Sequence, residues 1–177
     1  GGLQSIVSSL TIPVRPQVIQ SYAAGDYNRT LSLTFTISKL SCFFLYMLAL
    51  PVIAELDFLL HLWLGNDIPE YTSSFVVIII LTSFFSNLNA AVSGIVHASG
   101  QMKLYQLTTS LIGLLSIPLA YLMLKLYHNP NLALLMVLFV MMIIQIVSLM
   151  ILKRIVKYSI LSYFKEVIVP IVVVIIS

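Results

Sequence analysis

Long stretches without charged side chains are the feature that most limits how this chain can fold. Asp, Glu, Lys and Arg are absent from 1–14, 40–54, 71–102, 104–124 and 126–152. Of all residues, 60% are hydrophobic and 8% are charged, whereas soluble domains average about 25% charged residues. A soluble fold could not cover so much apolar surface with so few polar residues. The sequence therefore predicts a membrane protein.

The charge-free stretches are expected to form transmembrane helices. Backbone N–H and C=O groups cannot stay unpaired in lipid, and a helix pairs them within one segment. Runs such as VVIIIL and LALLMVLFVMMII do not alternate as the strands of a membrane barrel would. We predict an all-α fold, a polytopic membrane helix bundle with five full transmembrane helices and a truncated sixth. The expected spans are 3–23, 38–63, 74–98, 104–125 and 131–152, with the sixth over 167–177.

The two ends of the sequence favour a piece of a longer membrane protein. The chain opens with Gly1 and not with methionine, and its last apolar run covers only 167–177. A transmembrane helix needs about 20 residues. We therefore expect 1–177 to be a single membrane domain that belongs to a larger bundle.

Lysine and arginine are unevenly distributed between the expected loops. Lys125 alone follows the second or fourth span, and the other loop lysines and arginines follow the first, third or fifth. Cytoplasmic loops of membrane proteins carry an excess of basic residues. We therefore expect 25–38, 99–103 and 153–166 to be cytoplasmic. The net charge of +3 is explained by this bias, and no basic stripe with interleaved aromatics indicates nucleic-acid binding.

Arg15 is the most unusual residue of the expected first span. It precedes Ala24, where the span is expected to end, by about 13 Å of helix. An arginine at such a depth costs about 2.5–3.5 kcal/mol. In one interpretation it faces a water-filled cavity, where its planar fork meets the oxygens of an anionic substrate. In the other, its head reaches the cytoplasmic interface. Pro13 and Pro16 favour a bent or opened helix and hence the first interpretation.

Four further polar residues are candidates for the same cavity. Gln17 adds polarity near Arg15, although a helix would point it the other way. Lys39 begins the second span, where it either attracts phosphate at a cavity mouth or anchors the helix at the interface. Asn87 and Asn89 lie near the middle of the third span. They either line a cavity or bond across a helix interface, as asparagine often does in membrane bundles.

Other chemistries find no support in the sequence. It contains no phosphate-binding G-x-x-x-x-G-K-[ST] loop, no nucleophile elbow and no H-E-x-x-H motif. His61 and His128 are far apart in sequence, and Cys42 is the single cysteine. We therefore expect no catalytic residues, no metal site, no cofactor and no nucleic-acid partner, so the chain is not predicted to be an enzyme.

Five segments have a familiar pattern. They are RPQVIQSYAAGDYNR, ISKLSCFFLYMLALPVIAE, LWLGNDIPEYTSSF, HASGQMKLYQ and LIGLLSIPLAYLML. Together they resemble bacterial polysaccharide flippases, the O-antigen and capsule transporters of the multidrug/oligosaccharidyl-lipid/polysaccharide superfamily. The resemblance extends over about residues 1–160 of the chain.

This resemblance implies a fold and a function. Such proteins have twelve to fourteen helices in two six-helix lobes, of which this chain would form most of the second. They sit in the bacterial inner membrane and move an undecaprenyl-pyrophosphate-linked oligosaccharide from the inner to the outer leaflet for surface polysaccharide biosynthesis. Arg15 would then face the pyrophosphate and Lys39 would lie near the entrance. The expected partners are the lipid-linked oligosaccharide, the bilayer and the missing N-terminal lobe of the same chain.

Two other functions remain open at this stage. Relatives in the same superfamily export drugs in exchange for sodium or protons, so the chain could be a lobe of a multidrug or cation antiporter. A membrane scaffold subunit without transport activity is the third alternative. An arginine without a mid-span acid favours an anionic substrate over the cationic substrates of drug antiporters.

Overall fold

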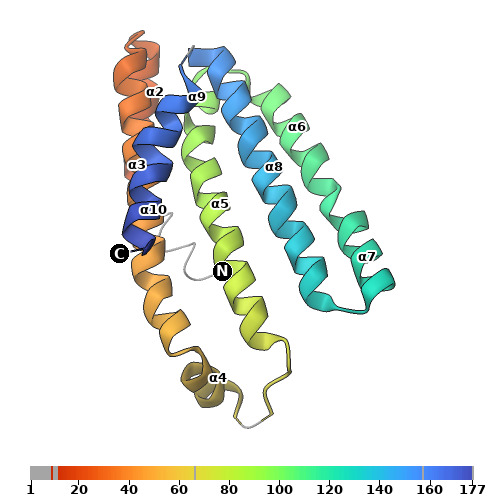
Figure 1. Ribbon diagram of the computed structural model, residues 1–177. Coiled ribbons are helices and arrows are strands. Elements are labelled where there is room, and N and C mark those ends of the chain that lie inside the picture. The colour runs from red at the N-terminus through yellow and green to blue at the C-terminus, as the bar shows by residue number, and fades with distance from the viewer. Residues whose placement is uncertain (1–8, 10–11, 66, 157, 177) are drawn as a thin grey trace.

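The computed structural model describes residues 9, 12–65, 67–156 and 158–176, and all regular structure in them is helical (Figure 1). The predicted all-α fold is confirmed for these residues. Four helical segments are long and apolar enough to cross a membrane, which is compatible with a membrane helix bundle. They are α3 (Tyr27–Ala54), α5 (Thr72–Ala98), α6 (Met102–Leu114) with α7 (Ser116–Tyr127), and α8 (Pro130–Val156).

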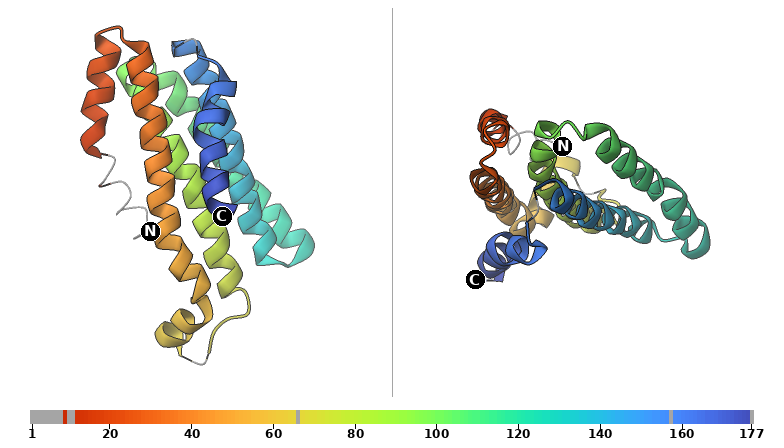
Figure 2. Two further views of the ribbon diagram at one scale, coloured as in Figure 1. Left: turned by 60° about the vertical axis from the view of Figure 1, so that its left-hand side comes forward. Right: turned by 90° about the horizontal axis from the view of Figure 1, so that it is seen from above.

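Helix α5 is the centre of the bundle. It lies between α3 and α8, and the α6–α7 segment packs on the far side of α8 (Figures 1 and 2). Its buried side chains Leu88, Val92 and Ile95 belong to the main apolar core. The connections after α2 (Arg15–Ala23), α5 and α8 meet at one end of the bundle (Figure 1). The loops expected on one side of the membrane therefore do share one end.

The expected first span, 3–23, is described only from Ile12, apart from Ser9. It contains the short 3₁₀ helix η1 (Ile12–Val14) and α2. Helix α2 packs against α3 and α5, close to the turn that joins it to α3. A full first span therefore remains a prediction, because residues 1–8, 10 and 11 lie outside the described residues.

A tight turn joins α2 to α3 and fixes their relative position. Gly25 has φ 75, a left-handed conformation that glycine adopts without steric cost. The Asp26 side chain then accepts a hydrogen bond of 3.0 Å from the backbone N–H of Arg29 and caps α3. The hydroxyls of Ser21 and Thr30 lie 2.9 Å apart and connect the two helices.

The stretch predicted as one span over 38–63 is not a single helix. Helix α3 begins at Tyr27, inside the loop expected over 25–38, and ends at Ala54, and a separate helix α4 (Leu56–Leu64) follows. Pro51 has no backbone N–H to donate within α3, and Glu55 leaves helical geometry with φ −108 and ψ 29. The chain then turns, so that α4 leaves the axis of α3 (Figure 1).

The other expected spans agree more closely with the helices. Helix α5 covers the expected span 74–98 and starts at Thr72, and α8 covers 131–152 and extends from Pro130 to Val156. The segment expected over 104–125 divides into α6 and α7 at Leu115. Pro118 has no backbone N–H, so it cannot bond the carbonyl four residues earlier. At the break, the Leu115 N–H bonds the Ile112 carbonyl, three residues earlier, at 3.1 Å.

The last helix begins earlier than expected. The loop predicted over 153–166 contains the end of α8, then α9 (Ile160–Tyr163) and a π-helical turn η2 (Phe164–Ile168), which continues into α10 (Val169–Ile176). Phe35 of α3 packs edge-on against Tyr158 and Tyr163, with ring centroids 6.2 and 5.4 Å apart. Burial raises the pKa of Tyr158 to about 12, so this phenol stays neutral where the final segment joins the bundle.

Candidate functional site

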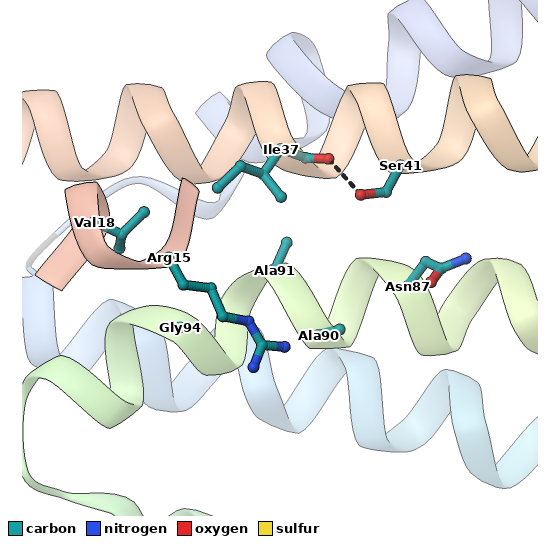
Figure 3. Close-up of a pocket in the computed structure, with 8 residues that line it drawn as sticks. All are labelled: Arg15, Val18, Ile37, Ser41, Asn87, Ala90, Ala91 and Gly94. Carbon is teal, nitrogen blue, oxygen red and sulfur yellow. Dashed lines mark hydrogen bonds between the residues drawn. The ribbon is translucent and has the colours of Figure 1, made fainter. Parts of the chain in front are cut away.

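Helices α2, α3 and α5 border a small cavity, and Arg15 is one of the residues that line it. Its volume is about 40 Å³. One water needs about 10–15 Å³ of such volume, so the cavity has room for a few waters. The lining residues, drawn in Figure 3, are Arg15, Val18, Ile37, Ser41, Asn87, Ala90, Ala91 and Gly94.

The local sequence of α2 places Arg15 at this cavity. Pro16 occupies the second position of α2, where the helix requires no backbone donor. Arg15 therefore starts the helix, and its exposed side chain extends across α5 toward Ala90 (Figure 3). A Cβ built on Gly94 would meet no atom within 4 Å. Small residues on α5 thus leave the guanidinium its space.

Asn87 contributes a buried amide to the same cavity. Its side chain is 7% exposed, and its Nδ2 has no hydrogen-bond partner among the described residues. A buried donor without an acceptor costs about 1–3 kcal/mol. In Figure 3 this nitrogen points away from the Arg15 guanidinium. A water or a ligand oxygen that reaches it and accepts the bond removes this cost.

Ser41 gives the cavity a hydroxyl oxygen. It donates its hydrogen to the Ile37 carbonyl at 2.7 Å (Figure 3), so that its lone pairs remain to accept. The cavity therefore combines a permanent cation, an amide donor and one hydroxyl acceptor. Such a set suits a ligand with several oxygens and negative charge, because arginine pairs with carboxylate or phosphate oxygens through two parallel bonds.

Asn89 lies on the other side of α5 and takes part in a closed network. Its Oδ1 accepts a hydrogen bond from the Tyr105 hydroxyl of α6 and lies 3.4 Å from the Ser148 hydroxyl of α8. Ser148 donates its single hydrogen to the Ile144 carbonyl at 2.7 Å. The structure thus places Asn89 in an interhelical contact, one of the two roles open to it in the sequence.

Gln17 and Lys39 are not among the residues that line the Arg15 cavity. Gln17 is exposed and lines a separate surface hollow of about 250 Å³ near the α2–α3 turn, together with Asp26 and Arg29. Lys39 is half-buried on α3. Of the five predicted cavity residues, the structure therefore brings Arg15 and Asn87 together and places the other three elsewhere.

Sequence reasoning did not include Ser41 and Gly94 among the site residues. Gly94 was detectable, because it lies seven residues after Asn87 and so shares its helix face. Ser41 carried no such signal, because the sequence does not distinguish it from the other hydroxyl residues of α3. Each of these residues bonds the backbone carbonyl four residues earlier: Thr30, Thr34, Ser38 and Ser41.

Comparisons with protein-family models, with curated protein sequences and with solved structures gave no match. Within the described residues, no three His, Cys, Asp or Glu side chains lie close enough to hold a metal ion. The arguments for function therefore rest on the residues themselves.

Proposed function

We propose that this chain is part of a membrane transporter for a lipid-linked oligosaccharide, and that Arg15 contacts the substrate's pyrophosphate. The observation that carries the proposal is the shared cavity of Arg15 and Asn87 between α2, α3 and α5. A cation and an unpaired amide donor in one membrane cavity suit an anionic group with many oxygens. The sequence resemblance to polysaccharide flippases supplies the substrate class and the direction, from the inner to the outer leaflet of the bacterial inner membrane.

The size of the cavity restricts how such a substrate binds. A cavity of about 40 Å³ holds waters and not a sugar chain, so only the phosphate oxygens reach it. The oligosaccharide occupies the space between this lobe and the missing lobe of the same chain. Transport then follows from rocking of the two lobes around a central site, as in other transporters built from repeated halves.

The first experiment compares two arginines in the full chain. Arg15→Ala is expected to abolish surface polysaccharide at a normal protein level, whereas Arg29→Ala leaves it unchanged, because Arg29 lies at the α2–α3 turn. Normal polysaccharide in a well-expressed Arg15→Ala variant would overturn the proposal. If drug tolerance changes instead, an antiporter is indicated, and if a partner fails to assemble, a scaffold subunit is indicated.

A second experiment measures substrate contact directly. A cysteine replaces Arg15 in a chain whose buried Cys42 is changed to alanine, and a membrane-impermeant thiol reagent is added from each side. Labelling that is blocked by undecaprenyl pyrophosphate is the expected result. Labelling that the lipid does not block, or no labelling from either side, would remove Arg15 from the substrate site.

A further inference from the structure

Helix α4 is a short helix of which the bundle covers little. It is nine residues long and contacts the ends of α3 and α5. Leu60 is its single buried residue. The side chains of Leu62 and Trp63 are 73% and 89% exposed. So large an exposed apolar surface on a short helix indicates a surrounding that is not water.

The exposed polar and apolar side chains of α4 lie on different faces of the helix. Asp57 and His61 are four residues apart and therefore share one face of the helix. Phe58 with Leu62, and Leu59 with Trp63, form two neighbouring apolar rows by the same spacing, and all four side chains are exposed. Helix α4 is thus amphipathic, with a narrow polar face and a wide apolar face that contains the single tryptophan of the chain.

The position of α4 in the fold identifies the surrounding. It connects the end of α3 at Ala54 to the start of α5 at Thr72, and both of these helices are long enough to cross a membrane. A helix at the ends of two spans lies at the level of the lipid headgroups. It turns away from the axis of α3 and does not extend it (Figures 1 and 2). Amphipathic helices with tryptophan on the apolar side lie in this interface.

From these observations we infer that α4 lies in the bilayer interface with Phe58, Leu59, Leu62 and Trp63 in the lipid. It holds the α3–α5 connection at a fixed depth. Because α4 contains no lysine or arginine and has the exposed acids Glu55 and Asp57 beside its start, its binding comes from apolar burial and not from attraction to anionic headgroups. This inference does not depend on the proposed function.

The single tryptophan provides the test. The full chain, with any tryptophan outside residues 1–177 changed to phenylalanine, is reconstituted in phosphatidylcholine vesicles that contain lipids brominated at different depths, and Trp63 emission is recorded. We expect quenching by bromine near the headgroups, weak quenching by aqueous iodide, and the same pattern when phosphatidylglycerol is added. Strong iodide quenching with no effect of brominated lipid would place α4 in water and overturn the inference. Protection from both quenchers would mean that protein covers α4, and would also overturn it.

A matched pair of cysteines gives a second measurement that does not rely on fluorescence. Asp57→Cys and Leu62→Cys are made in the chain whose Cys42 is replaced by alanine, and both are treated with a membrane-impermeant thiol reagent in vesicles. Because the thiolate is the reactive form and lipid suppresses it, position 57 should react about tenfold faster than position 62. Equal rates at the two positions would contradict a helix that lies in the interface.

Discussion

Two faces of α5 each carry an asparagine, and the surroundings of the two amides differ. Asn87 faces α2 and α3, lines the Arg15 cavity and has an Nδ2 without a partner among the described residues. Asn89 faces α6 and α8, where the Tyr105 hydroxyl donates to its oxygen and Ser148 lies 3.4 Å away. A polar residue inside a membrane bundle is therefore not in itself a site. A buried amide nitrogen without a partner in a cavity lined by a cation favours ligand binding, whereas an amide oxygen bonded to a neighbouring helix indicates packing.

The largest effect that follows from this difference is on transport. Asn87→Leu keeps the volume of the side chain but removes the donor in the Arg15 cavity. A hydrogen bond to a charged oxygen contributes about 1.5–3 kcal/mol, so under the proposed function transport of the lipid-linked oligosaccharide should fall at least about tenfold. The free energy of unfolding in detergent should stay equal or rise, because an unpaired buried amide is lost. A clear loss of stability would show that the amide has a partner in the bundle.

Two glycines, Gly94 on α5 and Gly113 on α6, allow a comparison of the open space beside them. Gly94 has no atom within 4 Å of a built Cβ, whereas a Cβ on Gly113 would lie 3.9 Å from Ile144 Cδ1. Gly113→Leu should destabilise the bundle more than Gly94→Leu does, because its longer side chain extends toward Ile144 of α8. Gly94→Leu should change stability by less than about 0.5 kcal/mol but should slow thiol labelling of a cysteine at position 15. Thermal unfolding and labelling rates check both, and equal destabilisation by the two would remove the distinction between the open cavity at α5 and the packed contact between α6 and α8.

The closed network around Asn89 should have a smaller effect. Hydrogen bonds between membrane helices contribute about 0.6 kcal/mol on average and up to about 1.7 kcal/mol. Asn89→Leu should therefore lower the free energy of unfolding within this range and leave substrate protection of position 15 intact. A double-mutant cycle with Tyr105→Phe measures the coupling of the pair. Additive effects would mean that the two side chains do not stabilise the bundle together.

The smallest effect is expected at the contact that positions α2. Ser21 and Thr30 also bond the Val18 and Asp26 carbonyls, so their mutual contact adds only part of a hydrogen bond. Ser21→Ala should cost about 0.5 kcal/mol. It should also make a cysteine at position 15 react faster, because α2 is held less firmly on α3. An unchanged labelling rate would show that the turn at Gly25 positions α2 without this contact.

The amino-acid sequence by itself determined the membrane class, the helical fold and the shared end of the basic connections. These properties depend on run length and on average hydropathy, which are local and additive. The positions of α5 and α8 followed from them closely. Arg15 was also identifiable from sequence, since a cation in an apolar run is costly wherever the neighbouring helices lie.

Only the tertiary structure decided which polar residues meet. Asn87 and Asn89 are two residues apart, so they point to different sides of one helix, and nothing in the sequence says whether α2 or α6 lies on a given side. The end of α3 at Ala54 was equally hidden, because the residues of α4 are as apolar as those of a span. Hydropathy measures transfer into lipid, so its value is similar for a helix that crosses the bilayer and for one that lies in its interface. The position of α4 relative to α3 and α5 is what distinguishes these two kinds of helix.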